Sequence, residues 1–434
     1  MVSSLQNEIN LWIDDMVAKE LQEVLDRALL QPIPVFAESG LGKHMGHIHE
    51  NRGLKFSEIL QIFKQATEGT LESVSEKLDG QNMFFTYNVG VGELKFGRNK
   101  GMIKAGGIDA QGIATKWEKL PNVKDAFFNA YNTLNKALAG VDPETLTSIF
   151  GPRGDIWFSI EVVSTFNPNV IEYNQNVIVF HKVSLVINEE GKVVNNENFQ
   201  REFAFLDSIV GDLQKNVADS KWKIMGPLVM QLKKATSNDL AAKHGQALMA
   251  VVSKYGLSPE NTIGDYLAAR WTENMAKSMD AETADRLGKI FGHPDLTPGQ
   301  RKKEAEKVVG RELANAHFKV SGQQKTENGL VLPLEKVIYD FAVDVLSGVH
   351  SAIALNPDEE VKRMQGAVKK QVELIKNSGE GDAMATMSRA LKKLQSVDRI
   401  TSSMEGIVFK FGDRTYKLTG TFSPVNQILG LFRF

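Results

Sequence analysis

The segment Ser75-Glu76-Lys77-Leu78-Asp79-Gly80-Gln81-Asn82 carries more information than any other stretch of this chain. At its centre a lysine is followed by one further residue, an aspartate and a glycine. Aspartate and glycine favour tight turns, so one interpretation is an ordinary charged turn. In the alternative interpretation, the turn presents the amine of Lys77 as a nucleophile. The residues that follow in the chain decide between the two.

Composition limits the class of protein. The 434 residues are too many for one compact core and predict two or three domains. A formal net charge of -2 gives no overall nucleic-acid footprint, so any such contact must come from a local patch. The absence of cysteine excludes thiolate metal sites, catalytic cysteines and disulfides. Without an apolar run of roughly 18 residues or a signal-peptide pattern, we expect a soluble cytoplasmic protein with no membrane partner.

Hydrophobic spacing predicts the elements of the first half of the chain. Apolar residues recur at helical spacing from Leu5 to Ala28, which predicts a long amphipathic helix, followed by a turn-rich linker. Another helix is expected over residues 122–140. Short apolar runs broken by glycine predict β-strands over Met83–Val89, Glu93–Gly97, Met102–Ala105, Ile156–Ser164 and Val177–Val186.

The second half is predicted to be helical until close to its end. Apolar stripes at helical spacing are formed by Val337, Ile338, Phe341, Val345 and Leu346 and by Val361, Met364, Val368, Val372 and Ile375. Residues expected to separate the helices are Pro294, Pro298, Pro333, Gly379 and Gly381. Strand patterns return at Gly406–Phe411 and Thr415–Leu418.

These elements predict an α+β protein in which an antiparallel-sheet domain is interrupted by a large all-helical insertion. The expected divisions are an N-terminal helical segment and linker over 1–60, the first part of the sheet domain over 61–199, the insertion over 200–395 and the last part of the sheet domain over 396–434. No repeat of fixed period is present.

Two glycine motifs are weak. Gly40-Leu41-Gly42-Lys43-His44 resembles a phosphate-binding P-loop, but Ala37 stands where the first glycine is needed and His44 where serine or threonine is needed. Gly90-Val91-Gly92 begins like a dinucleotide fingerprint, but no helical pattern follows it. It is better interpreted as a hairpin turn.

A histidine-rich segment has three open interpretations. His44, His47, His49 and Glu50 offer imidazole and carboxylate groups that suit a metal ion. A polar loop without a ligand is the commonest explanation of such a group. Contact with a phosphate or with RNA is the third.

Downstream of Lys77, five further motifs occur in a defined order. Arg98-Asn99-Lys100-Gly101 follows a predicted strand, Glu161 ends a strand, and Phe180 lies within another. Near the C-terminus, Glu405-Gly406-Ile407-Val408-Phe409-Lys410 precedes Tyr416-Lys417-Leu418-Thr419. An ordered set is far harder to obtain by chance than one short motif, and it favours the nucleophile interpretation.

Together these motifs resemble the covalent nucleotidyltransferase superfamily of ATP-dependent polynucleotide ligases and capping enzymes. Glu76 before the lysine, Asn82 five residues after it, and the short gap from Glu405 to Lys417 most resemble the RNA ligases. The similarity covers roughly residues 70–185 and 400–420. It implies a ligase adenylation domain and says nothing about the N-terminal helix or the helical insertion.

The resemblance also implies roles for individual residues. Lys77 would take AMP from ATP, with Glu76, Asp79 and Gly80 around the nucleophile and the sugar. Residues expected to contact ATP or its magnesium (or manganese) ion are Arg98 on sugar or phosphate, Glu161 and Glu405 on ribose and metal, Phe180 on the base, and Lys410 and Lys417 on the phosphates. Asn82 would act once the nucleic-acid phosphate enters. A lysine attacks only when unprotonated, so neighbouring cations, a metal or burial must lower its pKa.

Each of these residues also has a plainer explanation. Phe180 lies among apolar residues and fits a hydrophobic core, and Glu161 fits an edge-strand carboxylate. Lys410 fits a solvated strand residue, and Arg98 fits a charge in a turn.

Two departures from the family pattern matter. The family usually ends on Lys-x-Lys, but Lys417-Leu418-Thr419 lacks the second lysine. Either Lys410 or a residue of the insertion supplies that cation, or the later step of the reaction is altered. Few residues follow Gly420, which leaves no room for the C-terminal barrel of DNA ligases and capping enzymes.

The leading hypothesis is therefore an ATP-dependent RNA ligase: AMP passes from Lys77 to a 5′-phosphate, and a 3′-hydroxyl then displaces it. RNA contacts are expected from local groups such as Arg301-Lys302-Lys303 and Lys392-Lys393, although such runs are more often solvated helix faces. One alternative is a nucleotidyltransferase that modifies a protein or a small molecule. Another is a non-catalytic nucleotide-binding or assembly protein with the same fold.

Overall fold

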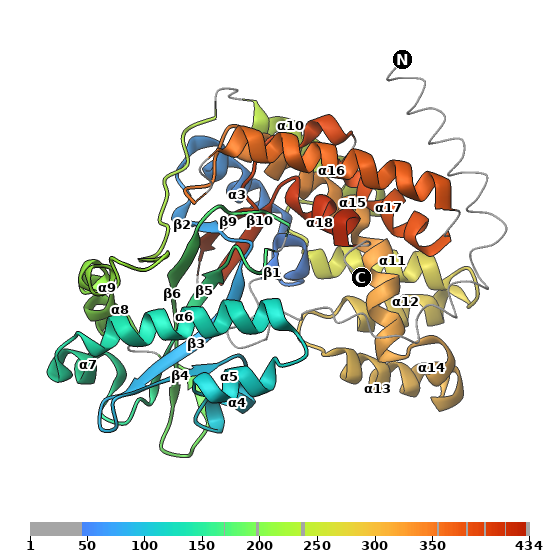
Figure 1. The fold of residues 1–434 in the computed structure, drawn as a ribbon. Helices are drawn as coiled ribbons and strands as arrows, with labels where there is room; N and C mark the ends of the chain where they lie inside the picture. Colours follow the sequence, from blue (N-terminus) through green and yellow to red (C-terminus); the bar gives the residue numbers. More distant parts are fainter. Residues whose placement is uncertain are drawn as a thin grey trace.

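The computed structural model describes residues 46–168, 170–196, 199–235, 239–353, 356–378, 381–394, 396–412 and 414–430 (Figure 1). The helix predicted from Leu5 to Ala28 and the glycine motif at 40–44 lie outside these residues. The described part is a mixed α+β protein with two sheets and a large helical region.

A four-stranded sheet joins two distant parts of the chain. Its strand order is β1 (Gly46–His47), β10 (Arg414–Thr419), β9 (Gly406–Phe411) and β2 (Glu72–Lys77). The inner pairs are antiparallel, and β1 runs parallel to β10. The C-terminal strands were predicted within a residue of their observed bounds. Of these two strands, β9 pairs with β2, so strands near the C-terminus share a sheet with strands from the first eighty residues.

The larger sheet follows β2 directly. Its path is β4 (Glu93–Gly97), β3 (Gln81–Asn88), β5 (Ile156–Val163), β6 (Asn176–Ile187) and β7 (Val193–Asn195), with β8 (Trp222–Met225) also on β6. All its pairs are antiparallel except β6–β8. The expectation of an antiparallel sheet is therefore wrong for both sheets, which have mixed strand orientation. In the large sheet, α8 (Phe199–Ser208) and α9 (Val210–Asn216) form the crossover that a parallel neighbour requires.

The region around residue 100 differs from prediction. Met102–Ala105 was expected to be a strand, but residues Lys100–Lys104 form helix α4. The side chain of Asn99 accepts a hydrogen bond from the backbone N–H of Met102 at 2.9 Å and so caps the first turn. By contrast, the predicted hairpin turn at 90–92 is confirmed, and it connects β3 to β4.

One face of the large sheet is covered by helices. Apolar side chains of β3, β5 and β6 pack with α5 (Ala110–Lys116), α6 (Pro121–Ala139), α7 (Pro143–Phe150), α8 and α9. Aromatic rings dominate this core, and Phe85 and Phe158 lie in it with no exposed surface. Side chains alternate along a strand, so the polar residues of the same strands project to the opposite face.

The helical region packs against the small sheet. It contains α10 (Leu240–Val252), α11 (Ile263–Met275), α12 (Ala281–Gly292), α13 (Pro298–Val309), α14 (Arg311–His317) and α15 (Val320–Leu346). These helices share a core with α3 (Phe56–Glu68) and with one face of β9 and β10. The stripe predicted around Phe341 is buried in α15, where the ring of Phe341 stacks on Phe63 at 4.0 Å.

Pro333 does not end a helix as predicted but lies inside α15. Proline removes one backbone hydrogen bond and favours a kink. Leu330 and Leu334 are buried on either side of it, and their packing offsets this local cost.

A third core lies where the two sheets meet. Apolar residues at the ends of β5 and β6 pack with α16 (Pro357–Ser378), α17 (Gly381–Leu394) and α18 (Phe422–Gly430). These three helices lie together in Figure 1. Within the described residues, no helix is both long and apolar enough to cross a membrane.

Glu76 ties β2 to the loop between α15 and α16. Its carboxylate accepts a hydrogen bond from the hydroxyl of Ser351 and another, at 2.9 Å, from the backbone N–H of Ala352. The side chain is almost fully buried, and burial raises the pKa of Glu76 although both hydrogen bonds lower it. The contact holds the strand that ends at Lys77 against the helical region.

This raised pKa predicts a pH dependence of stability. Because the folded protein favours the protonated carboxyl, the contribution of Glu76 is fully present below the unfolded pKa of about 4.3 and is lost as pH rises through the folded value. The free energy of unfolding of the wild type, minus that of Glu76→Gln, should therefore fall as pH rises above about 4.3. Urea unfolding measures it, with the exposed Glu118→Gln as baseline. A difference that stays constant or rises with pH would contradict this assignment.

Candidate functional site

Lys77 forms a buried ion pair with a residue from the other end of the chain. Its Nζ donates to a carboxylate oxygen of Glu405, and each side chain is only 10% exposed. Lys77 ends β2, and Glu405 comes directly before β9, where Lys77 and Gly406 are paired. The structure thus brings together two of the sequence-predicted residues that 328 positions separate.

Asp79 fixes the short connection between the two sheets. One of its carboxylate oxygens accepts hydrogen bonds from the backbone N–H groups of Val170 at 2.6 Å and Ile171 at 2.7 Å. Its own N–H donates to the hydroxyl of Tyr173 at 3.2 Å. Burial, and secondly the charge of Asp79, raise the pKa of Tyr173 well above its usual value, so this phenol stays neutral. Asp79 therefore acts as the anchor of the connection.

Glu161 lies against this connection from the large sheet. A methyl group added at Gly80 would stand 2.7 Å from Cγ of Glu161, so only glycine allows this approach. Asn82 is directly opposite Glu161 in the β3–β5 pair, and its amide donates to the hydroxyl of Ser159 at 2.6 Å. Gly80, Asn82 and Glu161 therefore form one polar group on the face not covered by α5–α9.

Arg98 reaches the same group from the end of β4. Its guanidinium donates to the backbone carbonyl of Asn82 at 3.1 Å and lies 5.6 Å from the centre of the Phe127 ring. Burial lowers the pKa of Arg98, and the charge of Glu161 opposes that change. The guanidinium is thus held between the sheet and α6, close to Glu161.

Phe180 is not brought into this group. Its ring is fully buried and stacks on Phe85 with centroids 5.5 Å apart, in the core beneath α5–α9. The next residue, His181, projects to the other face, and its Nε2 lies 3.2 Å from a carboxylate oxygen of Glu161. Sequence reasoning missed His181; strand alternation could have placed it on the face opposite Phe180, but only the register of β5 and β6 brings it beside Glu161.

Glu76 and Lys410 are also placed away from Lys77. Neighbouring residues of a strand face opposite ways, so the side chain of Glu76 and its hydrogen bonds lie on the opposite side of β2 from Lys77. Lys410 is exposed near the far end of β9, in register with Thr415 and Glu72. Neither contacts another predicted site residue in the interactions described above.

Lys417 shares a face with Lys77. Lys77, Gly406 and Thr419 lie opposite one another on three neighbouring strands of the small sheet, and Lys417 is two residues before Thr419 in β10. Directly opposed residues and every second residue of a strand project to the same side, which gives Lys77, Lys417 and Thr419 a common face. Lys417 is 7% exposed.

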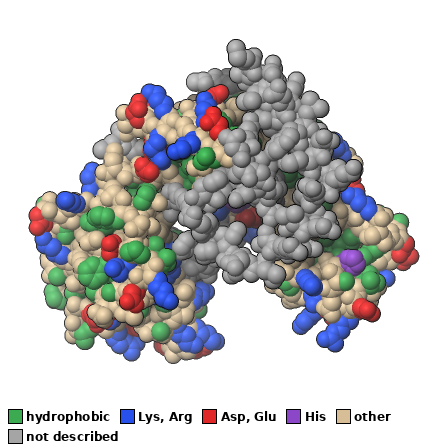
Figure 2. All heavy atoms as spheres, turned by 45° about the vertical axis from the view of Figure 1, so that its right-hand side comes forward, with side chains coloured by type: hydrophobic (Ala, Val, Ile, Leu, Met, Phe, Trp, Pro, Cys, Tyr) green, Lys and Arg blue, Asp and Glu red, His purple; other side chains and the backbone are tan. Residues whose placement is uncertain are grey.

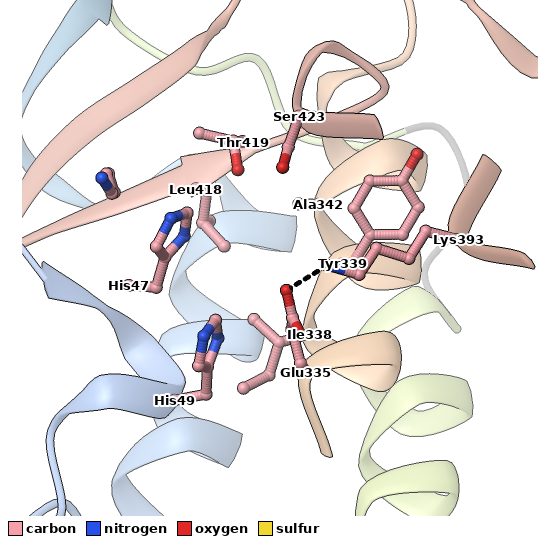
Figure 3. A pocket seen from close by; sticks show the side chains of 11 residues that line it. His47, His49, Glu335, Ile338, Tyr339, Ala342, Lys393, Leu418, Thr419 and Ser423 are labelled. Atoms are coloured by element: carbon pink, nitrogen blue, oxygen red, sulfur yellow. Dashed lines mark hydrogen bonds and ion pairs between the residues drawn. The ribbon is translucent and has the colours of Figure 1, made fainter. Parts of the chain in front are cut away.

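A narrow pocket opens at this end of β10 (Figure 3). Its polar lining consists of His47, His49, Glu335, Tyr339, Lys393, Lys417, Thr419 and Ser423. The rings of His47 and His49 stack with centroids 5.1 Å apart, and burial lowers the pKa of His49. Of the histidine-rich segment, these two residues line a pocket, whereas His44 lies outside the described residues.

No three histidine, aspartate or glutamate side chains in the described residues could hold a metal ion together. Glu161 interacts with His181, and Glu405 interacts with Lys77. A magnesium role for the two glutamates stays a prediction, since hard carboxylate oxygens suit that ion.

The two basic groups of the helical region take part in its own packing. Arg301 is buried and lies 3.4 Å from Glu327, and Lys302 lies 3.8 Å from Glu306. Lys393 is 2.6 Å from Glu335. On the described surface visible in Figure 2, basic and acidic side chains alternate without one large basic patch. Three members of these groups therefore pair with acidic residues of the helical region, whereas Lys303 and Lys392 are exposed.

No protein-family model matches the chain, and neither a curated protein nor a solved structure matches it. The interpretation of the site therefore rests on its own residues.

The contact between Gly80 and Glu161 yields a stability prediction. Gly80→Ala should destabilise the protein by about 1–3 kcal/mol, because the added methyl group must displace Glu161 and approach the carbonyl of Val162. Gly329→Ala is the matched control: this glycine lies within α15 with no atom near a new Cβ. Its replacement should stabilise the helix by about 0.5–1 kcal/mol. Denaturant unfolding of both variants measures the difference, and equal stabilities would contradict the close approach.

Proposed function

We propose that this chain is an ATP-dependent nucleotidyltransferase of the RNA-ligase kind, which carries AMP on Lys77. One observation carries the proposal: the buried Lys77–Glu405 pair stands at the junction of the two sheets, next to Asp79, Gly80 and Glu161. Such a lysine is positioned rather than solvated, and a positioned amine is what nucleophilic catalysis needs.

The first step follows from this geometry. The electron pair of Nζ attacks the α-phosphorus of ATP, an N–P bond forms, and the P–O bond to pyrophosphate breaks. Lys77 must first lose a proton, and Glu405 is the carboxylate within hydrogen-bond reach to receive it. Magnesium would neutralise phosphate charge beside Glu161 and Glu405.

The other polar residues have supporting roles in this proposal. Asp79 holds the connection on which Lys77 depends, and Arg98 presents a guanidinium next to Glu161 for a sugar or phosphate oxygen. Lys417, on the same face, offers a cation to the phosphates. Phe180 is left out, because its ring lies in the core on the other side of the sheet.

Transfer to RNA is the second half of the proposal. AMP would pass from Lys77 to a 5′-phosphate, and a 3′-hydroxyl would then attack that phosphate and release AMP. Asn82 lies beside Glu161 and Arg98, where an entering phosphate would find its amide. The support for RNA as acceptor is the sequence pattern around Lys77 and the spacing from Glu405 to Lys417.

Labelling with α-labelled ATP tests the first step. The wild type should acquire one label that is stable in alkali and labile in acid, as a phosphoramidate on lysine is, and Lys77→Ala and Lys77→Arg should acquire none. Lys77→Arg is the matched variant, because arginine keeps the charge that pairs with Glu405 while its guanidinium stays protonated and is no nucleophile. Label that persists in either variant would refute the proposed nucleophile.

The same experiment separates the alternatives. Parallel incubation with α-labelled GTP tests the choice of nucleotide. Label on Lys77 without joining of a 5′-phosphorylated RNA would indicate a protein or small-molecule acceptor. A folded wild type that takes no label would support a non-catalytic protein.

A further inference from the structure

The departure at Thr419 leaves a question that the pocket in Figure 3 can answer. The sequence pattern expects a second cation near Thr419, supplied either by Lys410 or by the helical insertion. Lys410 is four residues from the Thr419 row along the strand, roughly 13 Å away at the usual rise, and it is exposed. It is therefore poorly placed to act beside Thr419.

Lys393 is placed beside it instead. It comes from α17, at the end of the helical region, and lines the same pocket as Thr419 and Lys417. Its side chain is 11% exposed, and its Nζ lies 2.6 Å from a carboxylate oxygen of Glu335 in α15. Figure 3 shows this pair on one wall of the pocket, with the hydroxyls of Thr419 and Ser423 on another.

The lining has the chemistry of an oxyanion site. Lysine ammonium groups, imidazole N–H groups and hydroxyls are all hydrogen-bond donors, and Glu335 is the acidic member. The ammonium of Lys393 has three donors and gives one to Glu335, so the ion pair orients the lysine without using up its donors. Burial lowers the pKa of His49, the charges of Glu335 and Glu50 oppose that change, and Lys393 and Lys417 add to it, which places all four charged groups near the imidazole.

Size and position restrict the ligand. The interior has room for little more than a water molecule, so a base or sugar cannot enter it, and an anion would have to bind at its mouth. Thr419 is two strands from Lys77, roughly 10 Å at the usual strand spacing. The β- and γ-phosphates of a triphosphate whose α-phosphorus is at Lys77 cover part of this distance, and the side chain of a lysine at the pocket covers the rest.

We propose that Lys393 of the helical region is a phosphate-binding residue, which together with Lys417 and the His47–His49 pair receives the pyrophosphoryl part of the nucleotide. This inference rests on the proposed function, because that function supplies the nucleotide. It gives the helical region a direct part in the site.

Pyrophosphate binding to the Lys77→Arg protein tests the inference without requiring adenylate formation. The double variant Lys393→Met, Glu335→Gln removes both charges and so leaves no lone buried charge. Isothermal titration calorimetry should show that it binds pyrophosphate at least tenfold more weakly, because the lysine is lost. Glu335→Gln alone should strengthen binding several-fold, because the charge of Lys393 is no longer balanced. Lys392→Met, on the exposed neighbour, should stay within twofold.

Histidine spectra locate the ligand in the same samples. Pyrophosphate should shift the ring-nitrogen resonances of His47 and His49 and leave those of His293, at the end of α12, unchanged. Equal affinity with and without the Lys393–Glu335 pair, or no shift at His47 and His49, would overturn the inference. Thermal unfolding checks that each variant is folded. If the double variant does not fold, the stronger pyrophosphate binding expected for Glu335→Gln alone still tests the inference.

Two further outcomes keep this inference apart from the proposed function. If ATP does not label the wild type but pyrophosphate binding depends on Lys393, the pocket stands and the nucleotidyltransferase proposal fails. If ATP labels the wild type but pyrophosphate binding does not depend on Lys393, the nucleotidyltransferase proposal stands and the inference about the pocket fails. A 5′-phosphorylated oligoribonucleotide titrated in parallel shows whether the bound phosphate belongs to the nucleotide or to RNA. If Lys393 affects binding of the oligoribonucleotide and not of pyrophosphate, the assignment to the nucleotide is overturned.

Discussion

The buried ion pair between Lys77 and Glu405 is the interaction on which the rest of the site depends. Removing one partner of a buried pair typically costs about 3–5 kcal/mol, so each charge holds the other in place. The pairing of β2 with β9 makes the contact possible, and Gly406 lets β10 pack closely against β9 on its other edge. A methyl group at Gly406 would stand 2.1 Å from the carbonyl oxygen of Leu418.

Each of the two sheets carries part of the candidate site around this ion pair. The small sheet carries Lys77, Lys417 and Thr419 on one face and packs its other face on helices. The large sheet offers Gly80, Asn82 and Glu161 on its polar face, and Asp79 fixes the connection between the sheets. The same alternation of side chains that builds the hydrophobic cores therefore also collects the polar residues.

The helical region contacts the small sheet close to the candidate site. Glu76 binds the loop after α15, and Glu335 and Lys393 bring α15 and α17 to the edge of β10. The runs Arg301-Lys302-Lys303 and Lys392-Lys393 looked like surfaces for RNA in the sequence. Burial of Arg301 and Lys393 shows why a run of charges is a poor guide to exposure, since helix periodicity turns some members inward.

The sequence by itself determined most strands and the main helices, because alternation, helical periodicity and turn residues are local properties. It misplaced Met102–Ala105 because a single cap at Asn99 outweighed a short apolar run. Only the tertiary structure placed Phe180 in the core, His181 beside Glu161 and Lys393 beside Thr419. These placements depend on strand register and on contacts between segments far apart in the chain, which no local pattern encodes.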